Sequence, residues 1–183
     1  ACGVVDRLLP PLPLPQGSPM TDKTWHVLFV CTGNSARSIL AEGLLNALGG
    51  GRFKAWSAGS QPRGEVNPFA LAELRRLGLP ADGYRSKSWD EFAAPGAPAM
   101  DFIFTVCDQA AGEACPYWPG RPMTAHWGLP DPAAVEGDDA ERARAFRDTA
   151  VALKRRIELM LALPLDTLDA MSLQGRLAHI GRA

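Results

Sequence analysis

The sequence predicts an α/β fold with a small parallel β-sheet of about four strands and helices on both faces. Short apolar segments of strand type alternate along the chain with longer segments of helical periodicity. Such alternation is typical of strands joined by helical crossovers, which form a parallel sheet covered on both faces. Hydrophobic residues make up 46% of the chain, which is enough for one core.

The chain of 183 residues has the length of one domain, which we expect to occupy residues 23–183. Residues 1–22 contain five prolines and are expected to be a disordered N-terminal extension, because this composition favours extended, unpacked backbone. The net charge of −1 argues against binding to nucleic acid or an anionic membrane. No apolar run approaches the ~20 residues that span a bilayer, and no secretory signal is recognisable.

The first predicted strand, residues 26–30, leads directly into Cys31. Five residues separate Cys31 from Arg37, and a helical pattern runs from Ser38 to Leu48. A strand, a short polar loop and a helix N-terminus form an anion site, because the loop N–H groups converge and the helix dipole adds positive charge. We predict that the oxyanion is bound by Thr32, Gly33, Asn34, Ser35, Ala36, Arg37 and Ser38.

Cys31 is the predicted nucleophile of this anion site. The positive field of the loop is expected to favour the thiolate over the thiol, and the thiolate is the reactive form. Arg37 supplies a planar, charged fork that fits a tetrahedral oxyanion. A buried strand-end cysteine beside a surface arginine is the structural alternative. The joint occurrence of Cys31, Gly33, Arg37 and Ser38 at a strand-to-helix junction favours the catalytic interpretation.

The remaining elements follow from periodicity, caps and breakers. Three further strands are predicted, at residues 53–58, 101–106 and 124–127. Further helices are predicted at residues 67–78, 89–92, 138–163 and 165–180. The basic residues of the long helix are expected to form its solvated face: Arg142, Arg144, Arg147, Lys154, Arg155 and Arg156.

Three more reactive side chains follow the later strands. Cys107 follows the third strand, Cys115 lies in the next loop or short helix, and Asp131 follows the fourth strand. The carboxyl ends of parallel strands meet at one edge, so Cys31, Cys107 and Asp131 are expected to lie on one rim. Four cysteines are too few for a disulfide scaffold, which suggests a reducing cytoplasm and cysteines kept for chemistry. Taken singly, these residues also fit a core cysteine, a loop thiol and a turn aspartate.

The sequence resembles a known family in several motifs. The segment from Cys31 to Ser38, with Asp131-Pro132 far downstream, is similar to the low-molecular-weight tyrosine phosphatase fold. Four further segments resemble more specifically the arsenate reductases built on that fold: Thr105-Val106-Cys107-Asp108, Cys115-Pro116, His126-Trp127-Gly128 and Asp131-Pro132-Ala133. The similarity covers about residues 25–160, which is nearly all of the predicted domain.

This resemblance implies a cytoplasmic arsenate reductase that confers arsenic resistance. Cys31 would attack arsenate, Asp131 would protonate the departing oxygen, and Cys107 and Cys115 would complete a disulfide relay. The implied partner is an external thiol reductant, either thioredoxin or glutathione with glutaredoxin, and the protein is expected to be a monomer. His126 and Trp127 are expected to be structural and to pack under the acid loop.

Two departures from the family pattern carry expectations of their own. Seven residues separate Cys107 from Cys115, one more than in thioredoxin-coupled members, which leaves the reductant open. Lys87 stands where some relatives have an aspartate that helps to hold potassium. With Asn34, Glu42 and Ser57 nearby in the pattern, Lys87 is expected to supply that positive charge itself, so no potassium is required.

The relay places a geometric demand on the segment between the last two cysteines. A continuous helix over residues 107–115 would separate the Cα atoms of Cys107 and Cys115 by ~12 Å. A disulfide needs ~4.4–6.8 Å. We therefore expect this segment to bend or unwind, and to be mobile on oxidation.

Two other functions stay open at this point. One is a low-molecular-weight tyrosine phosphatase that works through a phosphocysteine at Cys31 and leaves Cys107 and Cys115 idle. The other is an arsenite- or metal-sensing protein with a trithiolate site, although a sensor has no need of Arg37. Cys107, Cys115 and His126 do not match a zinc pattern, because no fourth ligand is apparent, so no metal and no bound cofactor are expected.

Overall fold

The computed structural model describes residues 22–183, so the expectation of an N-terminal extension falls outside the described residues, apart from Asp22. The predicted sheet is confirmed: four strands pair in parallel in the order β2-β1-β3-β4. The strands are β1 (Trp25–Cys31), β2 (Phe53–Gly59), β3 (Phe102–Thr105) and β4 (Met123–His126).

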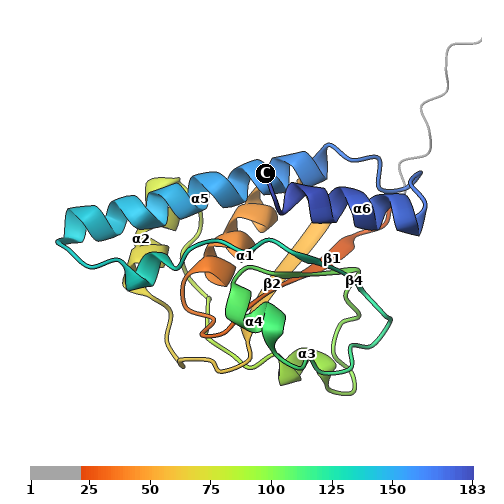
Figure 1. The fold of residues 1–183 in the computed structure, drawn as a ribbon, viewed down its shortest axis with the longest axis horizontal. Coiled ribbons are helices and arrows are strands. Elements are labelled where there is room, and N and C mark those ends of the chain that lie inside the picture. The colour runs from red at the N-terminus through yellow and green to blue at the C-terminus, as the bar shows by residue number, and fades with distance from the viewer. Residues whose placement is uncertain (1–21) are drawn as a thin grey trace, which may run out of the picture.

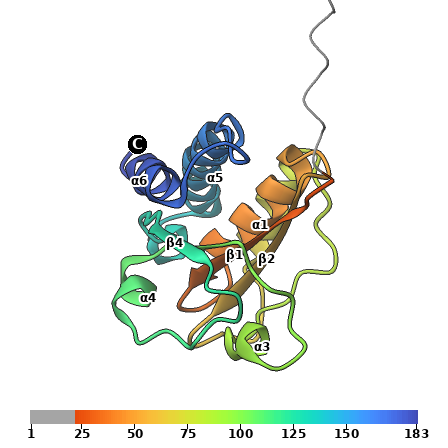
Figure 2. The same cartoon turned by 90° about the vertical axis from the view of Figure 1, so that its right-hand side faces the viewer.

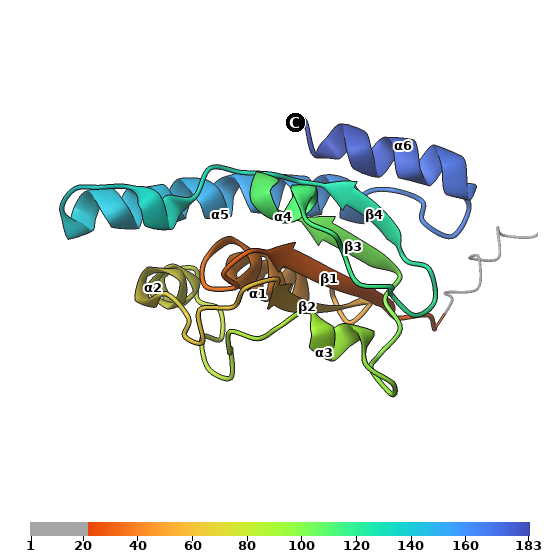
Figure 3. The same ribbon diagram turned by 60° about the horizontal axis from the view of Figure 1, so that its bottom comes forward.

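Helices cover both faces of the sheet, as predicted (Figure 1 and Figure 2). On one face lie α1 (Arg37–Leu48), α5 (Asp139–Leu161) and α6 (Ala170–Ile180), whereas α3 (Asp90–Ala93) lies on the other. The remaining elements are α2 (Pro68–Arg76), which packs on α1 and α5, α4 (Asp108–Gly112) and the 3₁₀ turn η1 (Pro132–Ala134). Figure 3 shows α6 beside β4.

Aromatic side chains join the sheet to the helices on each face. On the α5 and α6 face, Trp127 stacks on Phe104 with ring centroids 4.0 Å apart and also contacts Phe29. On the α3 face, Trp56 lies against Phe92. All of these rings except the half-buried Trp56 are buried, and their close packing fixes the strands relative to the helices.

The strand register brings the carboxyl ends together. Cys31 at the end of β1 pairs with Gly59 of β2, and Val30 pairs with Thr105 of β3. Thr105 pairs in turn with His126 of β4. The loops that follow β1, β3 and β4 therefore begin at one edge of the sheet, which is where ligands bind in open parallel sheets.

Two sequence-based expectations about the last helices need correction. The helix α6 begins at Ala170 rather than near residue 165, because Asp169 caps it by accepting from the Ser172 N–H at 2.9 Å. The expectation that Arg156 belongs to a solvated face is wrong, because this residue is only 6% exposed. Arg156 lies three residues after Leu153 and four before Met160, which places it on the buried stripe of α5.

Candidate active site

The loop between β1 and α1 is shaped by Asn34, which has a φ of 44° and adopts the left-handed conformation. Asparagine tolerates this conformation better than most residues. The Asn34 N–H donates to Cys31 Sγ at 3.2 Å, and its side-chain amide donates to Ser38 Oγ at 2.9 Å. The Asn34 Oδ1 accepts from the Lys87 N–H at 2.9 Å. Asn34 therefore curls the loop around the Cys31 sulfur.

Two neighbouring segments hold the outer side of this loop. Gly59 ends β2 so close to it that a Cβ atom there would lie 2.5 Å from the Thr32 carbonyl oxygen. The Gly33 carbonyl accepts from the Arg63 N–H at 3.0 Å and from the Ser86 hydroxyl at 3.1 Å. These contacts hold the loop backbone in place from its outer side.

The first turn of α1 provides donors at the open side of the loop. Ala36 is the N-cap residue, and no side chain caps this helix within the described part of the chain. N–H groups of an uncapped first turn are available to an anion. Arg37 follows, and its Nη1 donates to the Leu129 carbonyl at 2.7 Å, while its Nη2 lies 3.7 Å from Asp131 Oδ2. The Ala133 N–H donates to Asp131 Oδ1 at 3.0 Å, which holds the carboxylate beside Arg37.

The Cys31 thiol is buried, and its Sγ lies 2.9 Å from Ser38 Oγ. Burial raises the pKa of Cys31 above its ordinary value and the nearby Cys107 raises it further, whereas the hydrogen bonds with Ser38 and with the Asn34 N–H lower it. The net direction is upward, because burial disfavours the charged thiolate more strongly than these hydrogen bonds favour it. The loop contacts favour the thiolate as expected, but burial outweighs them, so the net shift of the Cys31 pKa is opposite to the expected direction.

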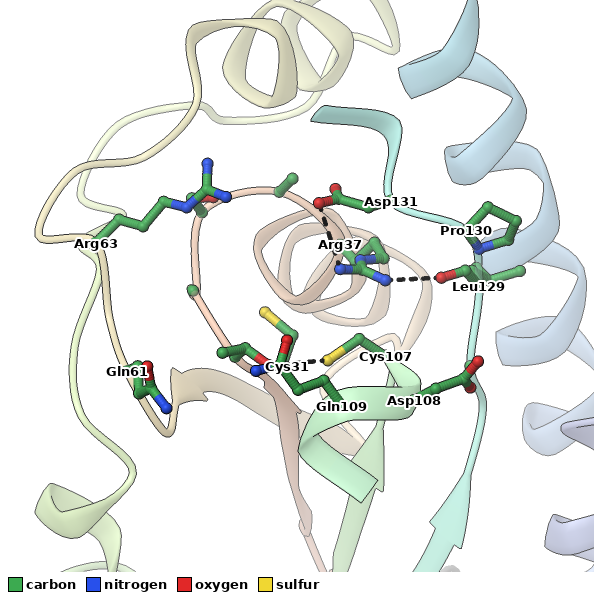
Figure 4. A pocket seen from close by; sticks show the side chains of 15 residues that line it. Cys31, Arg37, Gln61, Arg63, Cys107, Asp108, Gln109, Leu129, Pro130 and Asp131 are labelled. Atoms are coloured by element: carbon green, nitrogen blue, oxygen red, sulfur yellow. Dashed lines mark hydrogen bonds and ion pairs between the residues drawn. The ribbon is translucent and has the colours of Figure 1, made fainter. Parts of the chain in front are cut away.

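A cavity of about 640 Å³ opens at this edge of the sheet (Figure 4). Four of the five predicted catalytic residues line it: Cys31, Arg37, Cys107 and Asp131. Five of the predicted oxyanion-binding residues also line it: Thr32, Gly33, Ser35, Ala36 and Arg37. Asn34 and Ser38 are fully buried behind the loop and bind Cys31 or each other instead.

The two later cysteines lie in different environments. Cys107 is buried at the N-cap of α4, where its Sγ accepts from the Ala110 N–H at 3.4 Å and lies 3.5 Å from Thr32 Oγ1. Cys115 is exposed and lies outside the cavity lining, and partial burial together with Glu113 raises the pKa of its thiol. The segment 107–115 is not one helix, because α4 ends at Gly112 and Glu113 is extended.

Lys87 lies behind the loop and not in the cavity lining. Its ammonium donates to the Arg85 carbonyl at 3.1 Å. Burial lowers the pKa of Lys87, and the charge of Glu42 opposes this shift. Burial raises the pKa of Glu42, whose carboxylate accepts from the Ser57 hydroxyl at 2.5 Å. Lys87 and Glu42 thus stabilise each other's charged forms in a partly buried place.

Sequence reasoning missed four polar side chains of the cavity: Gln61, Arg63, Asp108 and Gln109. The most informative is Arg63, whose Nε lies 3.1 Å from the position that a Cβ of Gly33 would occupy. Figure 4 places its guanidinium at the rim of the cavity. The position of Gln61 and Arg63 in the sequence could have indicated this role, because both residues follow β2 at the carboxyl edge of the sheet.

The expected structural role is confirmed for Trp127, which is fully buried against Phe104. His126 lies instead on the opposite face of the sheet and is partly exposed. Its Nδ1 lies 2.8 Å from Thr105 Oγ1, and its Nε2 lies 2.8 Å from Asp108 Oδ1. Since Asp108 is the first residue of α4, His126 connects β4 to the start of that helix.

Over residues 22–183 no group of three or more His, Cys, Asp or Glu side chains gathers in a way that could hold a metal ion. None of the helices in this range is both long enough and apolar enough to cross a membrane.

Comparisons with known proteins agree with this fold. The sequence profile described as low molecular weight phosphotyrosine protein phosphatase matches residues 26–170. The arsenate reductase of Halalkalibacterium halodurans is 35% identical over 132 residues, which is 72% of this chain and 91% of that protein. The chain belongs to the low molecular weight phosphotyrosine protein phosphatase family. Within it, the curated relatives that match include arsenate reductases.

Solved structures give the same result. A structure of an arsenate reductase in the phosphate binding state has a TM-score of 0.59 and 28% identity, and the match covers 76% of this chain and 98% of that chain. A thioredoxin-dependent arsenate reductase of Corynebacterium glutamicum has a TM-score of 0.51 and 25% identity, covering 76% of this chain and 64% of that one. The fold described above therefore occurs in arsenate reductases of known structure.

We expect alkylation of Cys31 to have a pH midpoint above the ordinary thiol pKa of about 8.5, because burial raises its pKa. A raised pKa leaves less thiolate at neutral pH, so the rate continues to rise in alkaline buffer. Ser38→Ala moves the midpoint further upward, since it removes a hydrogen bond that lowers the pKa. The measurement is iodoacetamide labelling of the Cys31 peptide by mass spectrometry, with Ser88→Ala as the control. A midpoint below that of free glutathione would contradict this expectation.

We expect the same melting temperature in potassium and in sodium chloride at matched ionic strength, because the Lys87 ammonium already lies in the field of Glu42. Lys87→Asp places a second carboxylate there and makes the melting temperature rise with potassium. Lys154→Asp, an exposed change on α5, is the matched control and gives no such rise. A potassium-dependent increase in the parent protein would show that Lys87 does not replace the ion.

Proposed function

We propose that the protein is an arsenate reductase that converts arsenate to arsenite with the help of an external thiol. The observation that carries the proposal is the second thiol, because Cys107 and Cys31 line the same cavity together with Arg37 (Figure 4). A phosphatase hydrolyses its cysteine adduct with water and has no use for a second thiol. A reductase needs one to remove the adduct with its electron pair.

Arsenate is a tetrahedral, phosphate-like anion that fits the donors of the loop. In the proposed complex its oxygens bind the loop N–H groups and Arg37. The Cys31 thiolate attacks arsenic and forms a sulfur–arsenic bond. Asp131, protonated before this step, donates its proton to the departing oxygen, which leaves as water, and Asp131 becomes the carboxylate that lies 3.7 Å from Arg37.

The reduction follows from attack by the second thiol. The Cys107 thiolate attacks Cys31 Sγ, a disulfide forms and the sulfur–arsenic bond breaks. Its electron pair stays on arsenic, so arsenic(V) becomes arsenic(III) and two thiols become one disulfide. Cys115 then attacks Cys107 and releases Cys31, and an external dithiol reduces the Cys107–Cys115 disulfide through a mixed disulfide.

The last exchange requires α4 to open. Cys115 lies outside the cavity, and the Cys107 sulfur is engaged as the cap of α4. A disulfide needs Cα atoms ~4.4–6.8 Å apart, so the chain between the two residues has to rearrange. A helix of five residues is marginal by itself, and Gly112 at its end has open space around its Cα, which makes the rearrangement less costly.

The proposed reductant is thioredoxin, with glutathione and glutaredoxin as the other outcome of the test. The similarity to a thioredoxin-dependent arsenate reductase supports this choice. The exposed thiol of Cys115 supports it as well, because a protein dithiol can reach it directly. We propose that the protein acts as a monomer and confers arsenic resistance. Its proposed location is the reducing cytoplasm, where Cys31, Cys107 and Cys115 stay free.

Phosphotyrosine hydrolysis is the second candidate function, because the family profile bears that description. The lining of the cavity argues against it, since no aromatic side chain within residues 22–183 contributes to the lining. Trp118 and Trp127 are buried elsewhere, and Tyr117 is exposed outside the cavity. A phosphotyrosine ring would therefore find no aromatic surface on which to stack.

We expect arsenate-dependent oxidation of NADPH with thioredoxin and its reductase, and a loss of more than about a hundredfold in Cys31→Ser and in Cys107→Ser. Cys115→Ser is expected to lose turnover with thioredoxin as well, because the relay then stops at the Cys31–Cys107 disulfide. The same variants are assayed with glutathione, glutaredoxin and glutathione reductase, and with an aryl phosphate.

The outcomes of this assay separate the functions. Turnover with glutathione that survives Cys115→Ser keeps the reductase and changes its reductant. Hydrolysis of the aryl phosphate that needs only Cys31, with no reduction of arsenate in either system, assigns the protein to the phosphatases. Ser60 lies just after β2 and outside the cavity lining, so Ser60→Ala is the control for a substitution near the site.

We expect Arg63→Gln to raise the KM for arsenate by about fivefold at low salt with little change in kcat, because an exposed cation at the rim aids capture of the anion. The difference from the parent should shrink as salt screens this charge. Steady-state kinetics at two ionic strengths provide the measurement. Arg52→Gln removes an exposed charge at the start of β2, at the opposite end of that strand, and serves as the control. An unchanged KM at low salt would remove Arg63 from the binding site.

A further inference from the structure

Arg156 of α5 is a buried cation that the proposed reaction does not use. No Asp or Glu side chain within residues 22–183 forms an ion pair with it, and its Nε has no hydrogen-bond partner. Its guanidinium is held by main-chain oxygens. Nη1 donates to Trp127 at 2.6 Å and to Gly128 at 3.2 Å, and Nη2 donates to Ala183 at 3.4 Å.

These carbonyls belong to the segment that carries the proposed acid. Trp127 and Gly128 come immediately before Leu129, whose carbonyl accepts from Arg37 at 2.7 Å, and Asp131 follows two residues later. Residues 127–131, which we call the acid segment, are therefore held by Arg156 on the α5 side and by Arg37 on the cavity side. Both arginines bind the backbone close to Asp131.

The helix α6 supports the acid segment from a third side. The Leu177 carbonyl accepts from Trp127 Nε1 at 3.0 Å, and Gln174 Nε2 donates to the Thr124 carbonyl of β4 at 2.5 Å. Gly181 packs so closely on the His126 carbonyl that no side chain would fit there. The family profile ends at residue 170, where α6 begins, so this contact lies outside the part of the chain that the profile matches.

We propose that Arg156 and α6 form a brace that positions the acid segment, so that Asp131 stands ready to donate its proton. Arg156 is a positioning residue in this arrangement, and α6 is part of the active-site framework. The inference rests on the proposed function, because it takes Asp131 as the acid. In this proposal α6, which lies beyond the residues that the family profile matches, sets the efficiency of proton donation by Asp131.

The energetics favour positioning over plain packing. A charged group without an Asp or Glu partner is costly to bury, and an apolar side chain of similar volume packs at lower cost. The main-chain oxygen of Ala183, just beyond the end of α6, lies 3.4 Å from Nη2 and offsets part of this cost. An arginine at this position is useful because its rigid, planar guanidinium binds the Trp127 and Gly128 carbonyls of the acid segment at fixed angles.

The first experiment measures the brace directly by hydrogen exchange in the full-length protein. We expect Arg156→Met to raise the exchange rate of peptide amides in residues 127–135 by about tenfold, and to leave residues 31–38 unchanged. Arg155→Met, the neighbouring exposed arginine on the same helix, is the matched control. Unchanged protection of residues 127–135 in a folded Arg156→Met protein would overturn the proposal.

The second experiment separates positioning from general stabilisation. We expect Arg156→Met to lower kcat by about tenfold while the KM for arsenate stays within about twofold of the parent value. In an Asp131→Asn background the same change should lower kcat by less than about twofold, because the acid that it positions is gone. Arg156→Lys, which keeps the charge, should recover part of the loss. Equal losses in both backgrounds would assign Arg156 a purely structural role and overturn the inference.

The controls distinguish this inference from the proposed function. If Asp131→Asn lowers kcat and Arg156→Met does not, the acid role stands and the brace fails. If Asp131→Asn keeps full kcat, the acid role itself fails, whatever Arg156 does. Should Arg156→Met not fold, Gly181→Ala pushes the end of α6 away from His126 and is judged by the same exchange and kinetic criteria.

Discussion

The register of the four parallel strands is the constraint on which the whole site depends. Cys31 ends the central strand β1, where it pairs with Gly59 of β2. On the other side of β1, Val30 pairs with Thr105 of β3, two residues before Cys107. The acid segment leaves β4 at the same level. A shift of one residue in any pairing would turn side chains to the opposite face and separate the two thiols. The aromatic packing of Trp127 on Phe104 opposes such a shift.

Burial of Cys31 has two opposite effects on the chemistry that we propose. It raises the pKa of the thiol, which reduces the amount of nucleophile at neutral pH. It also lowers the local dielectric constant around the loop. Each N–H group and the Arg37 fork therefore bind an anion more strongly than they would in water. A deep thiol is reached most easily by a small oxyanion, and the polar, ring-free lining of the cavity favours the same choice.

Local sequence was enough to predict the groups that the backbone places by itself. Cys31 and Arg37 are fixed by one strand, one loop and one helix start, and Cys107 and Asp131 by the shared strand edge. The balance of forces on Cys31 was not predictable, because burial depends on segments distant in sequence. Arg63 and Arg156 were missed for a similar reason: the role of an arginine depends on what its long side chain reaches, and for Arg156 that includes the residues after α6.

The capping bond of α4 connects the proposed chemistry to the proposed movement. The reduced Cys107 sulfur accepts from the Ala110 N–H and so stabilises the first turn of a five-residue helix. Loss of an N-cap typically costs about 0.5–2 kcal/mol, which is substantial for a helix this short. Once Cys107 is joined to Cys31, its sulfur is no longer free to hold that position. The step that releases arsenite would then also loosen α4, and the helix would open only in the oxidised state, when Cys115 has to approach.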